Sequence, residues 1–310
     1  MTMHFHALAD QAAADGVISP QEILALRQAG WSDGKMTTEE AEALFAVNDR
    51  VADRSPEWCD FFIEAVSELL VNGLEPRGYV TEEQAAWLIA RLDHDGRLDS
   101  LTELELLVKV IERALNVPDS IKDYALHQIE QAVLTGQGPT RDGGMLEKGN
   151  VTAAEVRLIR RVIFAQAGDK PAAVSQREAD MLFRLKDAAL GAANAPEWKQ
   201  LFVQGVGNYL MALSTYQPLS RDRAVELEAF MNAPAGGIGK FLRSALSPAR
   251  LREGLGYLSQ GEPAATDTDA ALAAAEDVTS EERAWLDARI DADAQLDEME
   301  QALLDFLAEG

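Results

Sequence analysis

Residues 56–62 of the chain are PEWCDFF, and residues 196–202 are PEWKQLF. The pair Leu44-Phe45, upstream of the first of these segments, returns as Leu182-Phe183 upstream of the second. Self-similarity of this kind, in a preserved order, is the signature of a repeated structural unit. The sequence therefore predicts two tandem copies of one unit, so that the structure of one copy predicts that of the other.

A second pair of matching segments lies further along each copy. Residues 80–88 are VTEEQAAWL and residues 278–286 are VTSEERAWL, and each segment is followed closely by a short acidic run. The first pair of segments is offset by 140 residues and the second pair by 198. The difference between the two offsets is about 58 residues. We therefore expect a helical or irregular insertion in the second copy, at about residues 216–275.

Composition and periodicity favour helices over sheets. Of the 310 residues, 47% are hydrophobic but only 6% are aromatic, which is few for a protein built of β-strands. Apolar residues recur at helical spacing over residues 58–70. The same spacing recurs in a second stretch, which we predict to be core: Leu101, Leu104, Val108, Ile111 and Leu115. The predicted fold class is all-α, with two tandem copies of a helical bundle.

A glycine-rich segment separates the two copies. Residues 135–144 are TGQGPTRDGG, a polar run that does not suit a continuing helix. We predict a first helical domain over residues 1–135 and a linker over residues 136–147. The second helical domain then covers residues 148–310 and contains the insertion.

Charge and cysteine content restrict the partners and the compartment. The 52 acidic and 28 basic residues give a net charge of −24, which repels phosphate backbones and favours cations or basic protein surfaces over nucleic acid. The single cysteine, Cys59, has no cysteine to pair with in the chain. Neither a secretory signal nor a run of eighteen apolar residues is found, and we expect a soluble, cytoplasmic protein.

A short element recurs along the chain: a turn residue, an aliphatic residue, then Ser, Thr or Asp, and then an acid. One interpretation is a cation loop of EF-hand type, in which Asp and Glu oxygens surround Ca²⁺. The other is a capping box, in which Ser or Thr and a Glu three residues later close the start of a helix. The capping-box spacing occurs at six positions: Ser19, Thr37, Ser100, Thr152, Ser175 and Thr279.

The number of available ligands decides between the two interpretations for most loops. With Gly16 or Gly34 in the sixth position of a calcium loop, too few oxygen-bearing side chains precede it. Only the fourth loop is acid-rich, and a standard EF-hand is excluded there because its first position would be Arg91 and its twelfth Thr102. A capped turn and a site for Ca²⁺ or Mg²⁺ both remain open in this loop. The ligands of that cation site would be Asp93, Asp95, Asp99 and Glu103.

Residues 90–99, ARLDHDGRLD, lead into residues 106–118, LLVKVIERALNVP. Together with the earlier Asp-Gly turn at residues 15–19 and Glu22, this pattern resembles the TerB-like helical domains of the tellurite-resistance type. The resemblance implies a small helical domain whose acidic loops hold a divalent cation, used for sensing or scaffolding near membranes or stress-response machinery. The second copy departs from this pattern, because Lys148 replaces Asp15 and Ala294 replaces Gly96.

The insertion contains a basic segment, residues 238–252, that holds no acid. Such a segment is suited to docking on an anionic membrane or on an acidic partner, or to packing on its own acidic domain. The residues that we expect to dock are Lys240, Phe241, Arg243, Arg250 and Arg252.

Three classes of function are compatible with these patterns. The first is a non-enzymatic interaction or sensing module that binds a protein partner and a divalent cation. The second is a membrane-peripheral or partner-docking adaptor that acts through the insertion, and the third is an unrecognised enzyme. Acidity, the repeat and the lack of a catalytic motif favour the first.

Overall fold

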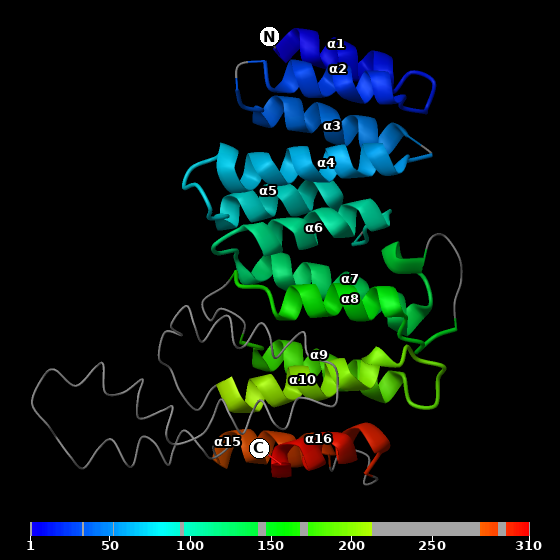
Figure 1. Cartoon of the computed structure of the whole chain (residues 1–310), viewed down its shortest axis with the longest axis vertical. Helices are drawn as coiled ribbons and strands as arrows, with labels where there is room; N and C mark the ends of the chain where they lie inside the picture. Colours follow the sequence, from blue (N-terminus) through cyan, green and yellow to red (C-terminus); the bar gives the residue numbers. More distant parts are fainter. Residues whose placement is uncertain are drawn as a thin grey trace, which may run out of the picture. The chain divides into compact units, whose positions relative to one another are not determined.

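The computed structural model describes residues 2–32, 34–51, 53–93, 96–141, 147–167, 173–212, 280–290 and 296–309. These residues are mostly helical (Figure 1), which confirms the predicted all-α class. Extended backbone pairs among them only in an isolated bridge between Tyr79 and Asn116. The chain divides into two compact units, residues 1–150 with 157–171 and residues 151–156 with 172–310. The predicted insertion at about 216–275 lies outside the described residues.

The first unit is built from helices α1 to α7. Their bounds are Thr2–Ala12 for α1, Pro20–Gly30 for α2, Thr38–Arg50 for α3, Pro56–Glu68 for α4, Glu82–Leu92 for α5, Leu101–Arg113 for α6 and Asp119–Thr135 for α7. A π-helix, η1 (Leu69–Gly73), continues α4, and a 3₁₀ turn, η2 (Pro139–Arg141), follows α7. The last residues of α8 (Ala153–Ile163) also belong to this unit.

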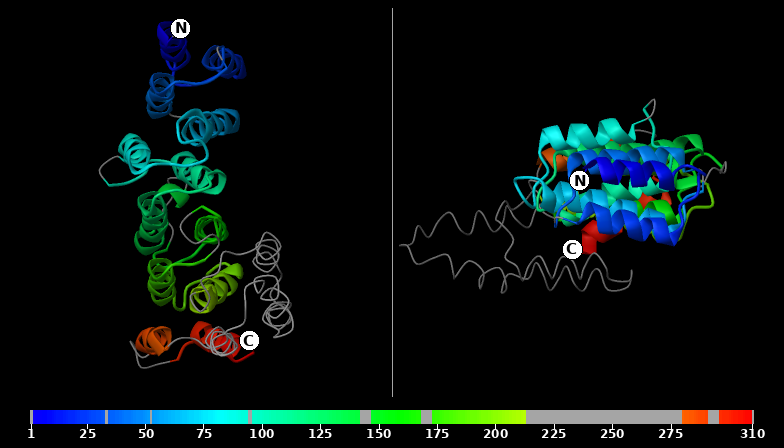
Figure 2. Two further views of the ribbon diagram at one scale, coloured as in Figure 1. Left: turned by 90° about the vertical axis from the view of Figure 1, so that its left-hand side faces the viewer. Right: turned by 90° about the horizontal axis from the view of Figure 1, so that it is seen from above.

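These helices form a two-layer stack in which each helix packs on the helix two places away in the chain. Helices α1, α3, α5 and α7 make one layer, and α2, α4 and α6 make the other (Figure 2). Such stacking is the architecture of helical-repeat proteins, in which each helix pair buries its apolar face against its neighbours.

Capping boxes begin most of these helices, as the sequence predicts. At Ser19, Thr37, Ser100, Thr152 and Ser175, the hydroxyl oxygen accepts the backbone N–H of the Glu three residues later, and the carboxylate of that Glu accepts the N–H of the Ser or Thr. The prediction is confirmed at these five positions, and Thr279 lies outside the described residues. The loops at Gly16 and Gly34 therefore lead into capped helices.

The core of the first unit contains Trp58, Phe61 and Phe62, all buried. The predicted core positions Leu104, Val108 and Ile111 are also buried. The prediction for Leu115 is wrong, since this side chain is 65% exposed. The helix α6 ends at Arg113, and the N–H of Leu115 donates instead to the carbonyl of Gly78, so the helical spacing no longer sets its direction.

The segment predicted as a linker is in part packed on the first unit. The αL conformation of Gly136 ends α7, and η2 then packs on α6 and α7 with Pro139 and Arg141 buried. An Nη of Arg141 donates to the carbonyl of Asn150 at 2.7 Å. Residues 142–146 lie outside the described residues.

The second unit contains the start of α8 together with α9, α10, α15 and α16. Their bounds are Gln176–Ala188 for α9, Glu197–Ala212 for α10, Ser280–Ile290 for α15 and Glu298–Glu309 for α16. Helix α10 packs on both α9 and α16. Helix α9 contacts α15 through the rings of Phe183 and Trp285.

The same aromatic contacts occur in both units. In the first, Phe45 meets Phe62 and Trp87 edge-on, with ring centroids 5.3 and 5.7 Å apart. In the second, Phe183 meets Phe202 and Trp285 edge-on, at 5.1 and 5.5 Å. Trp58 and Trp198 are both buried, and Trp87 and Trp285 are both half-buried. The repeated sequence segments thus supply the same contacts twice.

A buried lysine joins α9 to α16 in the second unit. The ammonium group of Lys186, which is 1% exposed, lies 2.6 Å from Asp297 Oδ2 and 2.5 Å from Glu300 Oε1. Burial alone would lower the pKa of Lys186, but hydrogen bonds to Asp187, Asp297 and Glu300 outweigh it and raise the pKa. Burial would likewise raise the pKa of Asp297, whereas its bonds to Lys186 and to backbone N–H groups lower it. The cluster therefore holds both partners in their charged forms.

A glycine allows α16 to approach α10 closely. A Cβ added to Gly207 would lie 2.5 Å from Cε1 of Phe306. That distance is well below van der Waals contact, so the phenyl ring occupies the space that a side chain at 207 would need.

We predict that Gly207→Ala destabilises the second unit by about 1–3 kcal/mol, because overpacking forces neighbouring groups to move. Shortening the ring in the double variant Gly207→Ala/Phe306→Leu should recover part of the loss. Urea denaturation followed by tryptophan fluorescence measures both. A Gly207→Ala protein as stable as its parent would contradict the contact.

The lysine cluster predicts a pH-dependent stability. The lowered pKa of Asp297 means that its contribution is present above the unfolded value of 3.8 and is lost as pH falls through the folded pKa. Asp297→Asn keeps the oxygen that caps α16 but loses the charge, and should cost about 1.5–3 kcal/mol at neutral pH.

The difference in unfolding free energy between Asp297→Asn and the parent should shrink in acid. The matched control is Asp187→Asn, whose carboxylate also contacts Lys186 but is 58% exposed and should contribute less than about 1 kcal/mol. A penalty for Asp297→Asn that persists unchanged at low pH would show that the charge plays no part.

Candidate functional site

The acidic loop between α5 and α6 is the first candidate from the sequence. Asp93 is the C-cap of α5, and its Oδ1 accepts the N–H of Gly96 at 2.6 Å. Gly96 has a φ of 82°, a conformation that favours glycine. His94 and Asp95 lie outside the described residues. The described part of the loop is thus a tight Asp-Gly turn.

Glu103, the last predicted ligand of this loop, points into the protein. It is 1% exposed, and its Oε2 accepts the N–H groups of Asp99 and Ser100 at 2.8 and 3.0 Å. Its Oε1 accepts the amide Nδ2 of Asn48 at 3.1 Å. Burial raises the pKa of the Glu103 carboxyl, although the two backbone bonds and the charge of Arg54 oppose that shift. Both oxygens therefore serve the start of α6 and its contact with α3.

This geometry leaves Asp93, Asp95 and Asp99 as the carboxylates of the loop that are not used in this way. Among the described residues, no three His, Cys, Asp or Glu side chains are grouped so that they could hold a metal ion. Because Asp95 is not among them, the cation site stays a prediction from the sequence. The basic segment of the insertion, with Lys240, Phe241, Arg243, Arg250 and Arg252, also lies outside the described residues.

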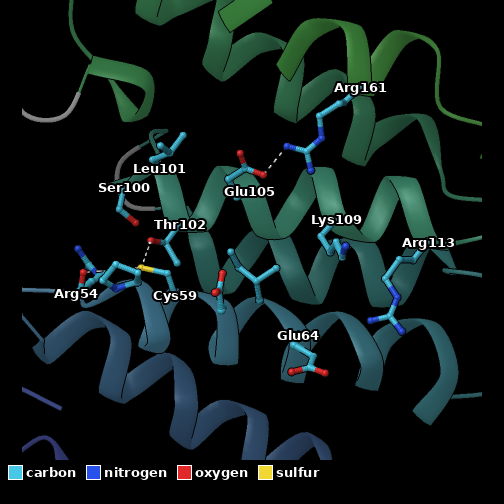
Figure 3. Close-up of a pocket in the computed structure, with 13 residues that line it drawn as sticks. Arg54, Cys59, Glu64, Ser100, Leu101, Thr102, Glu105, Lys109, Arg113 and Arg161 are labelled. Atoms are coloured by element: carbon cyan, nitrogen blue, oxygen red, sulfur yellow. Dashed lines mark hydrogen bonds and ion pairs between the residues drawn. The ribbon is translucent and has the colours of Figure 1, made fainter. Parts of the chain in front are cut away.

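A groove of about 990 Å³ lies between α4 and α6 in the first unit, and the sequence did not predict it (Figure 3). One wall is a face of α4 with Pro56, Cys59, Asp60, Ile63 and Glu64. The other wall is a face of α6 with Leu101, Thr102, Glu105, Lys109 and Arg113. Arg54, Ser100 and Arg161 complete the lining. These positions recur every three or four residues, as expected for one face of each helix.

The two helices run in the same direction along the groove. Near one end, Sγ of Cys59 lies 3.1 Å from Oγ1 of Thr102, and either atom can donate. Towards the other end, Arg113 donates to Ser67 Oγ at 3.1 Å and pairs with Glu68. The sequence interpretation of Cys59 was a buried structural thiol, but the side chain is only half-buried and lines the groove.

Most charges in the groove are paired with one another or with neighbouring residues. Arg161 bonds to Glu105 at 2.6 Å and to both oxygens of Glu112 at 2.7 and 2.8 Å. Hydrogen bonds to Glu112 and Glu105 raise the pKa of Arg161 against the effect of burial. Glu64 pairs with Arg27 at 2.9 Å. These interactions hold the walls of the groove in place.

Lys109 differs from the other basic groups of the lining. In the described part of the chain it has no ion pair and no hydrogen bond from its side chain, although Glu105 lies one helical turn before it. Glu105 is the usual partner for a lysine at this spacing, but its carboxylate is bound by Arg161. The groove therefore presents one half-buried ammonium group without a counter-ion.

Comparisons with family models, curated proteins and solved structures match nothing, so the resemblance to TerB-like domains stays a prediction. Within the described ranges, every helix is too short or too polar to cross a membrane.

The loop prediction has a direct calorimetric test with calcium, magnesium and manganese on the demetallated protein. If the loop binds a cation, Asp93→Asn/Asp95→Asn should abolish the binding, because Asn can keep the turn but removes two charges. The control, Asp15→Asn/Asp119→Asn, removes the same charge elsewhere and should leave binding intact. Cation binding that survives the change at 93 and 95 would refute the assignment.

Proposed function

We propose that this chain is a non-enzymatic protein-interaction module of helical-repeat type, whose binding surface is the groove between α4 and α6. The observation that carries the proposal is the groove itself. Its volume of about 990 Å³ lies at the upper end of the range of ligand pockets, and it lies along a pair of stacked helices. Stacked helical repeats commonly present such extended surfaces to partner proteins.

The interactions around the groove support a preformed binding surface. Arg161 with Glu105 and Glu112, Arg113 with Glu68, and Glu103 with Asn48 all hold lining residues or the helices that carry them. A wall that is already ordered loses little conformational entropy when a partner binds. Ile63, Leu101 and Pro56 add apolar contact area between the charged groups.

We infer further that the two units arose by duplication. The aromatic contacts of Phe45 and Phe183 match, and so do their polar neighbours. Trp87 and Arg91 both donate to Glu42, as Trp285 and Arg289 both donate to Asp180. Equivalent residues thus meet equivalent partners at the offsets seen in the sequence.

A filled groove should lose its partner. Ile63→Trp places a bulky side chain in the middle of α4's groove face, and Leu24→Trp is the matched control because Leu24 is 54% exposed on α2. A photo-cross-linking residue at position 60 identifies the partner in cells, and the same residue at position 24 gives the background.

The affinity of the purified partner then decides the proposal. We expect Ile63→Trp to weaken binding by about tenfold or more, equivalent to about 1.4 kcal/mol, and Leu24→Trp to leave it unchanged. Melting temperatures show that both variants fold. Equal cross-linking at positions 60 and 24, or an affinity that Ile63→Trp does not change, would count against the groove as the binding surface.

A further inference from the structure

The charge of the groove is opposite in sign to that of the chain as a whole. The lining holds four basic residues, Arg54, Lys109, Arg113 and Arg161, against three acidic ones, whereas the whole chain has a net charge of −24. A local excess of positive charge on an acidic protein attracts anionic groups to that place and not to the remaining surface.

The ion pairs of the lining show which charge is available to a partner. Arg161 is held by Glu105 and Glu112, and Arg113 by Glu68. The guanidinium of Arg54 donates from Nε and Nη2 to the side chain and the carbonyl of Asn48 at 3.1 and 3.0 Å. The ammonium group of Lys109 has none of these partners, so a carboxylate brought to it forms a new ion pair without breaking an existing one.

From this arrangement we propose that the groove binds an acidic peptide segment of a partner protein, with a carboxylate of that segment paired to Lys109. This inference rests on the interaction function proposed above and names the chemistry of the partner. A half-buried lysine gains more from such a pair than an exposed one, because its charge is less screened by water.

The acids of the lining select against a polyanion. Asp60, Glu64 and Glu105 lie on the same walls as Lys109, so a run of phosphates or of consecutive acids would meet repulsion along the groove. The preferred segment therefore carries one acid between apolar residues that contact Ile63 and Leu101. The groove face of α6 from Leu101 to Arg113 is about 18 Å long, which matches an extended segment of about five residues.

Synthetic peptides of equal length test this preference. Three labelled peptides carry the same flanking Gly and Ser residues around a core of Leu-X-Leu, where X is Glu, Gln or Lys. Fluorescence anisotropy with the full chain should detect saturable binding of the Glu peptide, at least tenfold tighter than that of the Gln and Lys peptides. Binding of the Glu peptide should weaken as salt rises, because an ion pair at a partly exposed site is screened.

Variants of the lysine locate the site. Lys109→Glu should weaken binding of the Glu peptide at least tenfold, and Lys109→Arg should retain most of it. Lys122→Glu on α7 is the matched control, since it makes the same charge change outside the groove and should leave binding unchanged. Thermal denaturation confirms that each variant is folded.

The outcomes separate this inference from the proposed function. If the Glu and Gln peptides bind equally, and Ile63→Trp abolishes binding while Lys109→Glu does not, the acidic preference is overturned and the groove remains a protein-binding surface. If no peptide binds, or if inorganic phosphate alone binds at Lys109, the acidic-segment proposal is also overturned. The cross-linking at position 60 then decides the interaction function separately.

Discussion

The carboxylate of Glu103 joins three helices of the first unit through buried hydrogen bonds. It accepts the backbone N–H groups of Asp99 and Ser100 at the start of α6 and the side-chain amide of Asn48 on α3. Asn48 in turn accepts the indole N–H of Trp58 on α4 at 3.3 Å. A buried polar group left without its partner costs about 1–3 kcal/mol, so these bonds fix α3, α4 and α6 against one another. The groove between α4 and α6 depends on that arrangement.

The second unit meets the same constraint with a charge. Lys186 is in the position on α9 that corresponds to Asn48, and Glu300 on α16 corresponds to Glu103. An ammonium group cannot accept a hydrogen bond, and the indole N–H of the buried Trp198 has no partner among the described residues. The salt bridge of Lys186 with Asp297 and Glu300 thus replaces a neutral network that also satisfied the tryptophan. Two related sequences stabilise the same helix contacts with different chemistry.

The sequence predicted what depends on neighbouring residues and missed what depends on distant ones. Capping boxes are set by residues three apart, and those at Ser19, Thr37, Ser100, Thr152 and Ser175 follow directly from their spacing. The groove was not predicted because α4 and α6 are neighbours in space but separated by α5 in the chain. The unpaired state of Lys109 is further removed, since it depends on Arg161 binding a glutamate 56 residues away. Repeat spacing predicted equivalent tryptophans but gave no sign that Asn48 and Lys186 differ in role.

The difference between Asn48 and Lys186 also bears on how a chain with two similar halves avoids misfolding. Exchange of equivalent helices between neighbouring domains is a characteristic failure of tandem proteins. A hybrid core in which α16 packed on α3 would bury Asp297 and Glu300 beside the neutral amide of Asn48, without any ammonium group. Burying unpaired carboxylates costs several kcal/mol, so such a hybrid is strongly disfavoured. One changed residue type in each core thus acts as an address that returns α16 to its own half.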